Sequence, residues 1–296
     1  MSQVLNAFTV DVEDYFQVSA FEHRIRRSDW DRMESRVVRF TDRLLTLLDE
    51  VSVRGTFFVL GWVAERYPKL IKRIATAGHE IASHGYWHRL VYELTEEEFA
   101  DDIAASVDAI TTACGIRPTA YRAPSFSITQ RSLWALDILV EQGFQLDSSI
   151  FPISGHDRYG MPSANKEIHQ LATSAGSLCE FPPSLGRVAG LSVPIGGGYF
   201  RLLPCNLTLA AVTSVQRREH PAMFYIHPWE IDPEQPRIDG VGWKSRFRHR
   251  VGLRHTESKL RKLLKSRPFD CIETVLENHR SRNEPIQGKP AVQTAV

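Results

Sequence analysis

Short apolar runs alternate with helix-like segments along most of the chain, and this alternation limits how the chain can fold. Residues 39–51 space four leucines as in a helix, and residues 94–110 begin with Thr95 and Glu98 in a capping-box pattern. The runs between helical patterns that we predict as strands are AFTVDV, GTFFVLG, HEIASH, TAYRAP, GFQLDSS, LCEFPPS and AMFYIHP. Strands that alternate with helices predict a parallel sheet covered by crossover helices, and so an α/β fold.

The size and charge of the chain narrow its class. A chain of 296 residues with 43% hydrophobic content can bury a large core. Lys+Arg number 36 and Asp+Glu 35, so the net charge of +1 gives no reason to expect nucleic acid as a partner. The stretch 281–296 lacks apolar periodicity, and we expect it to be a loose tail behind a domain of residues 1–280.

Three features predict a cytoplasmic protein. A signal peptide has basic residues ahead of an apolar stretch, and the N-terminus of this chain has none there. The most apolar stretch, GTFFVLGWVA, is too short to cross a bilayer. The four cysteines are scattered without a CxxC pair, which favours neither a zinc ribbon nor a disulfide framework.

Polar residues stand where most of the predicted strands end. Chemistry in parallel α/β folds collects at this edge of the sheet, so several such residues predict one shared site. The five exits concerned carry Asp11, Glu13 and Asp14, then His84 and His88 in SHGYWH, then Arg122 in RAPS, Asp147 in LDSS and His227 in YIHPWE.

His84 and His88 lie four residues apart, so both imidazoles can reach one ion from a helical turn or a tight loop. One carboxylate would complete a three-ligand site with open positions for water, which is typical of catalytic metals. The same spacing taken alone more often marks surface histidines or satisfied core histidines. Because the HEIAS run places His84 at a strand exit, we favour the metal site.

The motifs TVDVED, SHGYWH, RAPS, DSS and YIHP resemble those of the polysaccharide deacetylases of carbohydrate esterase family 4, over residues 8–228. DVEDYF, SSIFPISGHDRYG, PIGGGYFRLLP and HPWEIDPEQPR resemble most closely the subfamily associated with bacterial exopolysaccharide and exosortase gene clusters. The resemblance implies a distorted (β/α) barrel, with a subfamily-specific portion from about residue 230. It also implies metal-dependent removal of N-acetyl groups from amino-sugar polymers.

The resemblance also implies roles for the residues at the strand exits. Asp11 would be the general base, and His84 and His88 the two metal-binding histidines. Arg122 would orient the base. His227 would be the general acid, and Asp147 the carboxylate that tunes it. The chemistry agrees, because a guanidinium beside Asp11 would keep it ionised. A carboxylate beside His227 would favour the imidazolium that protonates a leaving amine. Arg122 and Asp147 taken singly would suggest a structural salt bridge or a turn.

The carboxylate that would complete the metal site is ambiguous. The commonest pattern of the family has two adjacent aspartates, whereas Val12 follows Asp11 here, so the ligand is Glu13 or Asp14. Strand alternation places Glu13 on the face of Asp11 and makes it the first choice. If the strand ends or bulges after Val12, Asp14 turns inward instead. Zinc is the default ion for such ligands, and cobalt, nickel or iron would also suit them.

Candidate substrate-binding residues flank these motifs. Tyr86, Trp87 and Trp229 could pack on a sugar ring or an acetyl methyl group, or could be core aromatics. Further candidates are Pro124 and Ser125 in RAPS, and Tyr199 and Phe200 beside the glycines of PIGGGYFRLLP, a segment that could equally be a plain turn.

The segment 244–267 is strongly basic, with Glu257 its one acid. Leu260, Leu263 and Leu264 give its latter part an apolar face, so we expect helices packed on the body by that face. The alternative is a site for an anionic polymer or peripheral contact with a membrane surface.

Three functions fit these features. The leading one is a metal-dependent deacetylase of an N-acetylated polysaccharide or its lipid-linked precursor, met at the inner face of the membrane. The second is an amidase acting on a small amide with the same groups. The third is a carbohydrate-binding protein without turnover, which retention of a metal, base and acid set disfavours.

Overall fold

The computed structural model describes residues 4–155 and 159–283. In this part of the chain nine strands form one sheet in the order β10-β1-β2-β3-β4-β5-β7-β6, with β11 also paired to β1. All pairs are parallel except β6 with β7. The strands are β1 (Asn6–Val12), β2 (Thr56–Val59), β3 (Glu80–Ser83), β4 (Ala120–Tyr121), β5 (Leu146–Asp147), β6 (His169–Thr173), β7 (Gly176–Glu180), β10 (Met223–Ile226) and β11 (Phe269–Asp270).

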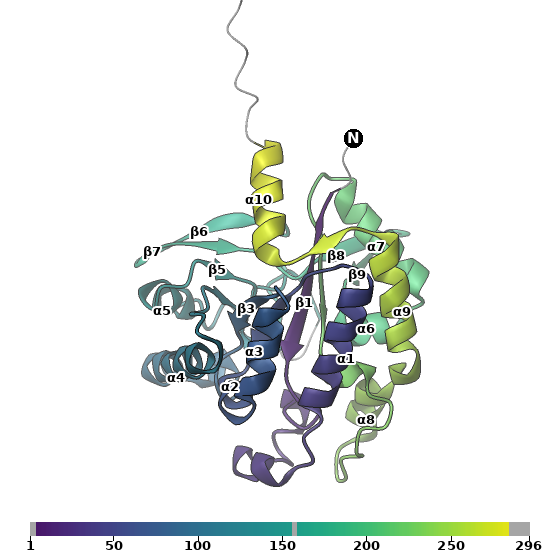
Figure 1. Cartoon of the computed structure of the whole chain (residues 1–296). Coiled ribbons are helices and arrows are strands. Elements are labelled where there is room, and N and C mark those ends of the chain that lie inside the picture. Colours follow the sequence, from purple (N-terminus) through teal and green to yellow (C-terminus); the bar gives the residue numbers. More distant parts are fainter. Residues whose placement is uncertain (1–3, 156–158, 284–296) are drawn as a thin grey trace, which may run out of the picture.

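Helices surround this sheet (Figure 1). α1 is the helix that the leucine spacing predicted, and it buries Leu44, Leu47 and Leu48 while Leu45 is only partly buried. The predicted capping box of Thr95 and Glu98 is present at the start of α4. The helices are α1 (Val37–Glu50), α2 (Gly61–Arg66), α3 (Pro68–Thr76), α4 (Glu96–Cys114), α5 (Ala135–Glu141), α6 (Gly197–Leu202), α7 (Cys205–Gln216), α8 (Trp243–Arg250), α9 (Leu253–Ser266) and α10 (Ile272–Asn283).

The two ends of the sheet come together beyond β7. The chain after β7 runs through two prolines to Ser184, whose hydroxyl accepts a hydrogen bond from the Met223 backbone N–H at the edge of β10 (2.8 Å). Gly196 forms a further bridge to Tyr225 on the same edge. The sheet is therefore a distorted, incompletely bonded (β/α) barrel, which confirms the predicted fold class. A hairpin of β8 (Leu185–Val188) and β9 (Leu191–Pro194) packs beside α7.

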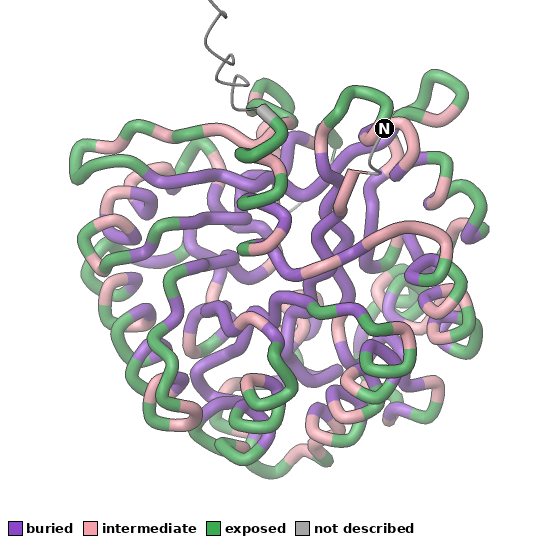
Figure 2. The backbone as a smooth tube through the Cα atoms, turned by 45° about the horizontal axis from the view of Figure 1, so that its top comes forward, coloured by how far each residue is buried: buried purple, intermediate pink, exposed green. Residues whose placement is uncertain are grey.

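β1 lies at the centre of the molecule (Figure 1), and all seven of its residues are buried. Figure 2 shows that the buried backbone gathers in the interior, with exposed segments at the periphery. Each of the seven predicted strands overlaps an observed one, whereas β6, β8, β9 and β11 were not predicted. The four cysteines are free thiols. None of the described helices is both long and apolar enough to cross a membrane.

The C-terminal region differs in part from the sequence analysis. α10 continues to Asn283, so residues 281–283 of the expected tail are helical, and residues 284–296 lie outside the described residues. In the basic segment, α9 buries Leu260, Leu263 and Leu264 as expected. α8 instead leaves Trp243 and Phe247 exposed.

Candidate active site

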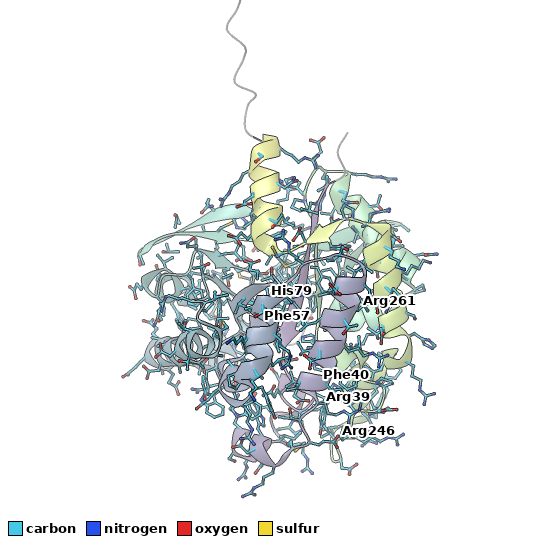
Figure 3. The ribbon with its side chains drawn as sticks, in the orientation of Figure 1. Arg39, Phe40, Phe57, His79, Arg246 and Arg261 are labelled. Carbon is cyan, nitrogen blue, oxygen red and sulfur yellow. The ribbon has the colours of Figure 1, made fainter. Side chains whose placement is uncertain are left out.

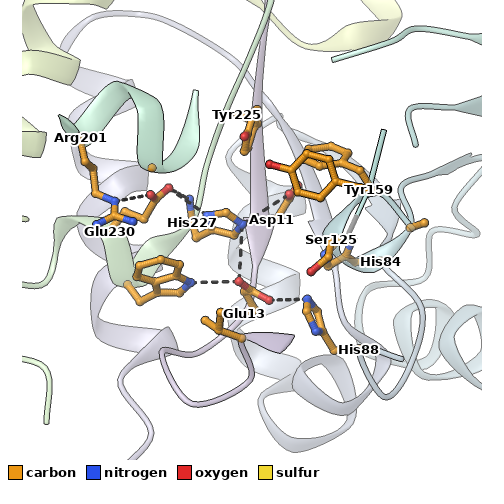
Figure 4. Close-up of a pocket in the computed structure, with 15 residues that line it drawn as sticks. Asp11, Glu13, His84, His88, Ser125, Tyr159, Arg201, Tyr225, His227 and Glu230 are labelled. Atoms are coloured by element: carbon orange, nitrogen blue, oxygen red, sulfur yellow. Dashed lines mark hydrogen bonds and ion pairs between the residues drawn. The ribbon is translucent and has the colours of Figure 1, made fainter. Parts of the chain in front are cut away.

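A cavity of about 140 Å³ lies where β1, β3, β4 and β10 end (Figure 4). It therefore occupies the edge of the sheet where the sequence analysis expected the strand exits to converge. The polar residues that line it are Asp11, Glu13, His84, His88, Ser125, Arg201, His227 and Glu230, with Tyr159, Tyr225 and Trp229 among the aromatic ones.

Three of these residues could hold a metal ion. Ligand atoms of Glu13, His84 and His88 lie within 4.8 Å of one another, and all three residues are buried. Nδ1 of His84 donates to the Arg122 backbone carbonyl (2.7 Å), which leaves its Nε2 lone pair for a ligand bond. Burial lowers the pKa of His84 to about 4, so its imidazole is neutral.

Glu13 supplies the negative charge of this cluster. Burial opposes its ionisation, but the imidazoles of His88 and His227 outweigh burial and hold the pKa of Glu13 well below its usual range. Oε1 accepts a hydrogen bond from Trp229 Nε1 (3.0 Å). Oε2 lies 2.7 Å from His88 Nε2 but receives no hydrogen bond with acceptable geometry. A buried carboxylate oxygen that has no well-aligned hydrogen bond and lies beside two imidazoles fits a divalent cation.

Asp14 lies outside the cavity. β1 does end at Val12, yet the tight turn closed by the Glu13 N–H on the Asp11 carbonyl (3.0 Å) still directs Glu13 into the site. Asp14 instead accepts hydrogen bonds from the Ser35 hydroxyl (2.7 Å) and from the backbone N–H groups of Arg36 (2.7 Å) and Val37 (3.0 Å). Its carboxylate thus caps the start of α1, and the structure favours Glu13 as the ligand.

Arg122 contacts Asp11, as the sequence analysis expected. Its Nη1 donates to Asp11 Oδ1 (2.6 Å) and to the Thr9 hydroxyl (2.9 Å). Its Nη2 donates to the Ser148 hydroxyl (3.0 Å), and the guanidinium lies 4.0 Å from the centre of the Phe58 ring. Because Arg122 is fully buried and held on several sides, it fixes the orientation of the Asp11 carboxylate.

His227 is paired on its far side with a buried carboxylate. Its Nδ1 lies 2.9 Å from Glu230 Oε2, and Arg201 Nε donates to Glu230 Oε1 (2.5 Å). Its Nε2 faces the cavity, 3.5 Å from Glu13 Oε1 and 3.7 Å from Asp11 Oδ2. Burial alone would lower the pKa of His227, but the carboxylates of Glu13 and Glu230 outweigh burial and raise it to about 9.

Glu230 therefore takes the place that the sequence analysis assigned to Asp147. Asp147 accepts hydrogen bonds from the hydroxyl (2.6 Å) and backbone N–H (3.1 Å) of Ser149, and burial raises its pKa. Burial likewise disfavours the charged form of Glu230, but Arg201 and His227 lower its pKa to about 2. The signal for Glu230 was its place three residues after His227 in HPWE, where it closes a capping box.

The expected substrate-binding residues divide into two groups. Ser125 and Trp229 line the cavity, and Tyr199 lines a neighbouring cavity of about 770 Å³. Neither cavity lining includes Pro124, Phe200, Tyr86 or Trp87.

Local packing explains why those four residues lie elsewhere. Pro124 is buried, and Phe200 packs edge-on against Phe224 in the core, with ring centres 4.9 Å apart. The Tyr86 hydroxyl donates to Glu65, and the Trp87 ring packs beside Trp30. Tyr225, which does line the cavity, belongs to a predicted strand but was not recognised as a site residue.

The chain resembles known proteins in two consecutive regions. Residues 30–144 match the polysaccharide deacetylase family model, and residues 148–277 match a domain of unknown function, DUF3473. A peptidoglycan-N-acetylglucosamine deacetylase of Bacillus cereus is 34% identical over 110 residues, 37% of this chain and 38% of that protein. A chitooligosaccharide deacetylase of a Bradyrhizobium species is 32% identical over 100 residues, 33% of this chain and 43% of that protein. The chain thus matches less than half the length of these relatives.

A solved structure matches over nearly the whole chain. The crystal structure of a candidate polysaccharide deacetylase from Mycobacterium smegmatis has a TM-score of 0.64 and 23% identity, covering 95% of this chain and 91% of that one. This likeness establishes the fold.

Both matched regions contribute to the cavity. His84, His88 and Ser125 come from the first region, and Arg201, His227 and Glu230 from the second. Asp11 and Glu13 precede both.

Proposed function

Because residues 30–144 match the polysaccharide deacetylase family model and residues 148–277 match DUF3473, we propose that the protein is a metal-dependent N-deacetylase. Its substrate would be an amino-sugar polymer or a precursor of one, and zinc is the proposed ion. One observation carries this proposal. A buried set of metal-ligand types shares a cavity of about 140 Å³ with a carboxylate and an imidazole suited to move protons.

The cavity residues divide the reaction between them. A divalent cation held by Glu13, His84 and His88 would polarise the amide carbonyl and acidify water. Asp11, kept in place by Arg122, accepts the proton of the water that attacks the carbonyl carbon. His227, as the imidazolium, gives the proton from Nε2 to the nitrogen as the carbon–nitrogen bond breaks. The products are acetate and the free amine.

The extent of the hollow beside the site supports a glycan rather than a small amide. The 140 Å³ cavity shares lining residues with the cavity of about 770 Å³, among them Tyr159, Arg201 and Trp229. Volumes of roughly 300–1,000 Å³ are typical of sites that enclose whole ligands. The motifs that resemble the exopolysaccharide-associated subfamily support a role in exopolysaccharide biosynthesis.

The test is metal analysis combined with acetate release. Protein stripped with a chelator should lose activity towards N-acetylglucosamine oligomers and regain it on addition of zinc or cobalt. Full activity without metal would contradict the proposal. Formation of a free amine from small cyclic and linear amides would reveal an amidase.

Two variants test the division of labour. Asp11→Asn keeps the side-chain shape but removes the proton acceptor, so its activity should stay low at any metal concentration. Glu13→Gln weakens a ligand, so excess metal should restore part of its activity. Recovery of Asp11→Asn at high metal would show that Asp11 is mainly a ligand.

A further inference from the structure

The 770 Å³ cavity, hereafter the groove, extends the candidate active site towards α8. It shares Tyr225 and Trp229 with the smaller cavity. Its remaining walls come from the segment around η1 (Ser19–Phe21), from α6 and from α8. A ligand held in the groove would therefore continue into the cavity where the amide would be cleaved.

The described residues that line the groove give it positive charge. Among the described residues that line it, none is Asp or Glu, whereas Arg201 and Arg248 are both present. Arg201 is engaged with Glu230 and with backbone carbonyls. Arg248 is exposed, and none of the ion pairs between described residues includes it. Residues 243–256 contain no acid, so the potential at this end of the groove favours an anion.

The same wall presents apolar side chains to solvent. Phe247 is 56% exposed and Leu202 is 55% exposed, and both line the groove. Tyr199 lies on α6 beside Leu202, and Trp229 forms the boundary with the smaller cavity. Large exposed apolar side chains gathered along a hollow mark a binding surface. Aromatic side chains next to a cation suit a sugar ring that bears a negative charge.

The groove wall is fixed relative to the candidate active site. Arg201 donates from Nη1 to the carbonyls of His249 and Val251 and from Nη2 to that of Arg248, each at 2.9 Å. The backbone at Gly252 has φ +74°, and a Cβ there would lie 2.3 Å from the Arg201 carbonyl oxygen. The end of α8 thus packs directly on the residue that holds Glu230. A preformed groove loses little free energy to ordering when a ligand binds.

We propose that the groove binds an anionic sugar next to the N-acetylated sugar in the smaller cavity, so that the substrate is an acidic glycan. Arg248 would pair with the negative group, and Phe247 would pack on a ring. This inference rests on the proposed function and narrows its substrate class.

The first test compares binding of two probes of equal length. One is a hyaluronan hexasaccharide, in which N-acetylglucosamine alternates with glucuronate, and the other is the neutral N-acetylglucosamine hexamer. Binding is measured by calorimetry on zinc-loaded Asp11→Asn protein, which should bind without turnover. The acidic probe should bind more tightly, and its advantage should decrease as salt is added.

Variants on one helix locate the effect. Arg248→Ala should weaken binding of the acidic probe about 10-fold, equivalent to about 1.4 kcal/mol, and leave the neutral probe nearly unchanged. Arg246→Ala is the matched control, because Arg246 is an exposed arginine of α8 that does not line the groove (Figure 3). Phe247→Ala should weaken both probes.

Three outcomes would overturn the inference. They are equal binding of the two probes, equal effects of Arg248→Ala and Arg246→Ala, and tighter, Arg248-dependent binding to anionic phosphatidylglycerol vesicles than to the acidic probe. The vesicle result would assign this surface to a membrane. Acetate release by the unmodified enzyme is measured separately. Activity without preference for the acidic probe would remove only this inference, whereas Arg248-dependent binding without acetate release would remove only the deacetylase function.

Discussion

The two halves of the candidate active site hold their charges in different ways. The donor half contains His227, the proposed proton donor, with Glu230 and Arg201. These three residues form a chain in which every charge has a protein partner. In the cation half, Glu13 faces His84 and His88, and its buried Oε2 lies 2.7 Å from His88 Nε2 without a well-aligned hydrogen bond. The donor half is therefore complete in the protein alone, whereas the cation half offers ligand atoms that an ion could bind.

This difference implies that mutations in the two halves should have different effects. Loss of a residue from the cation half should remove the ion and the chemistry together. Loss of a residue from the donor half should leave the ion bound and change proton transfer alone. The predictions below test this separation, beginning with the largest expected effect.

Removal of a histidine from the cation half should have the largest effect. His84→Ala or His88→Ala leaves two ligands, so bound metal should be largely lost. Activity should fall by more than about 100-fold, because removing a residue that only supports a metal ligand already costs up to that much. Metal content after desalting and acetate release measure the two effects. Full metal content in both variants would contradict the assignment of the cation half.

Removal of the proton donor His227 should reduce turnover while the metal ion stays bound. His227→Ala should lower turnover by roughly 10²- to 10⁴-fold, because the leaving amine loses its proton source. Its metal content should equal that of the unmodified protein. If His227→Ala loses its metal as His84→Ala does, the two halves are not separate.

Loss of Glu230, the partner of the proton donor His227, should shift the pH profile of the reaction rate. Glu230→Gln removes a negative charge that raises the pKa of His227, so the imidazolium would lose its proton at lower pH. Since the imidazolium is the active form, the alkaline limb of the rate profile should move to lower pH, whether or not a bound cation also lowers that pKa. Asp147→Asn is the matched control and should leave the limb in place. A shift in the control alone would return the tuning role to Asp147.

Strands and their exits could be predicted from the sequence because each is a local pattern. An apolar run followed by a polar residue located β1, β3, β4, β5 and β10 and the residues that follow them. β11 pairs through only two residues, and the hairpin of β8 and β9 exposes Leu191, so neither has a clear apolar pattern.

Partners could be predicted less well, because they depend on tertiary packing. Arg201 reaches Glu230 from α6, and nothing local indicated that contact. The glycines of PIGGGYFRLLP suggested a substrate-binding loop or a plain turn, yet Gly197–Leu202 is the helix α6. The helical turn of α6 places Phe200 in the core and Tyr199 in the lining of the groove. A helical face of this kind cannot be recognised in so short a segment.

The smallest predicted effect concerns Asp14, the acid that lies next to the cation half without belonging to it. Asp14→Ala would leave the Ser35 hydroxyl and the backbone N–H groups of Arg36 and Val37 without their acceptor. The free energy of unfolding of the metal-free protein should fall by about 1–2 kcal/mol, the cost of a lost helix cap. Metal affinity below the melting temperature should not change.

Glu13→Ala provides the contrast, because it should cost metal affinity while changing the unfolding free energy of the metal-free protein less than Asp14→Ala does. Asp14→Asn retains an acceptor oxygen, so it should recover part of the stability lost in Asp14→Ala. Thermal unfolding with chelator present measures stability, and metal titration at low temperature measures affinity. If Asp14→Ala weakens metal binding as strongly as Glu13→Ala in protein that is still folded, then Asp14 acts on the ion. In that case the carboxylate of the cation half cannot be assigned to Glu13 alone.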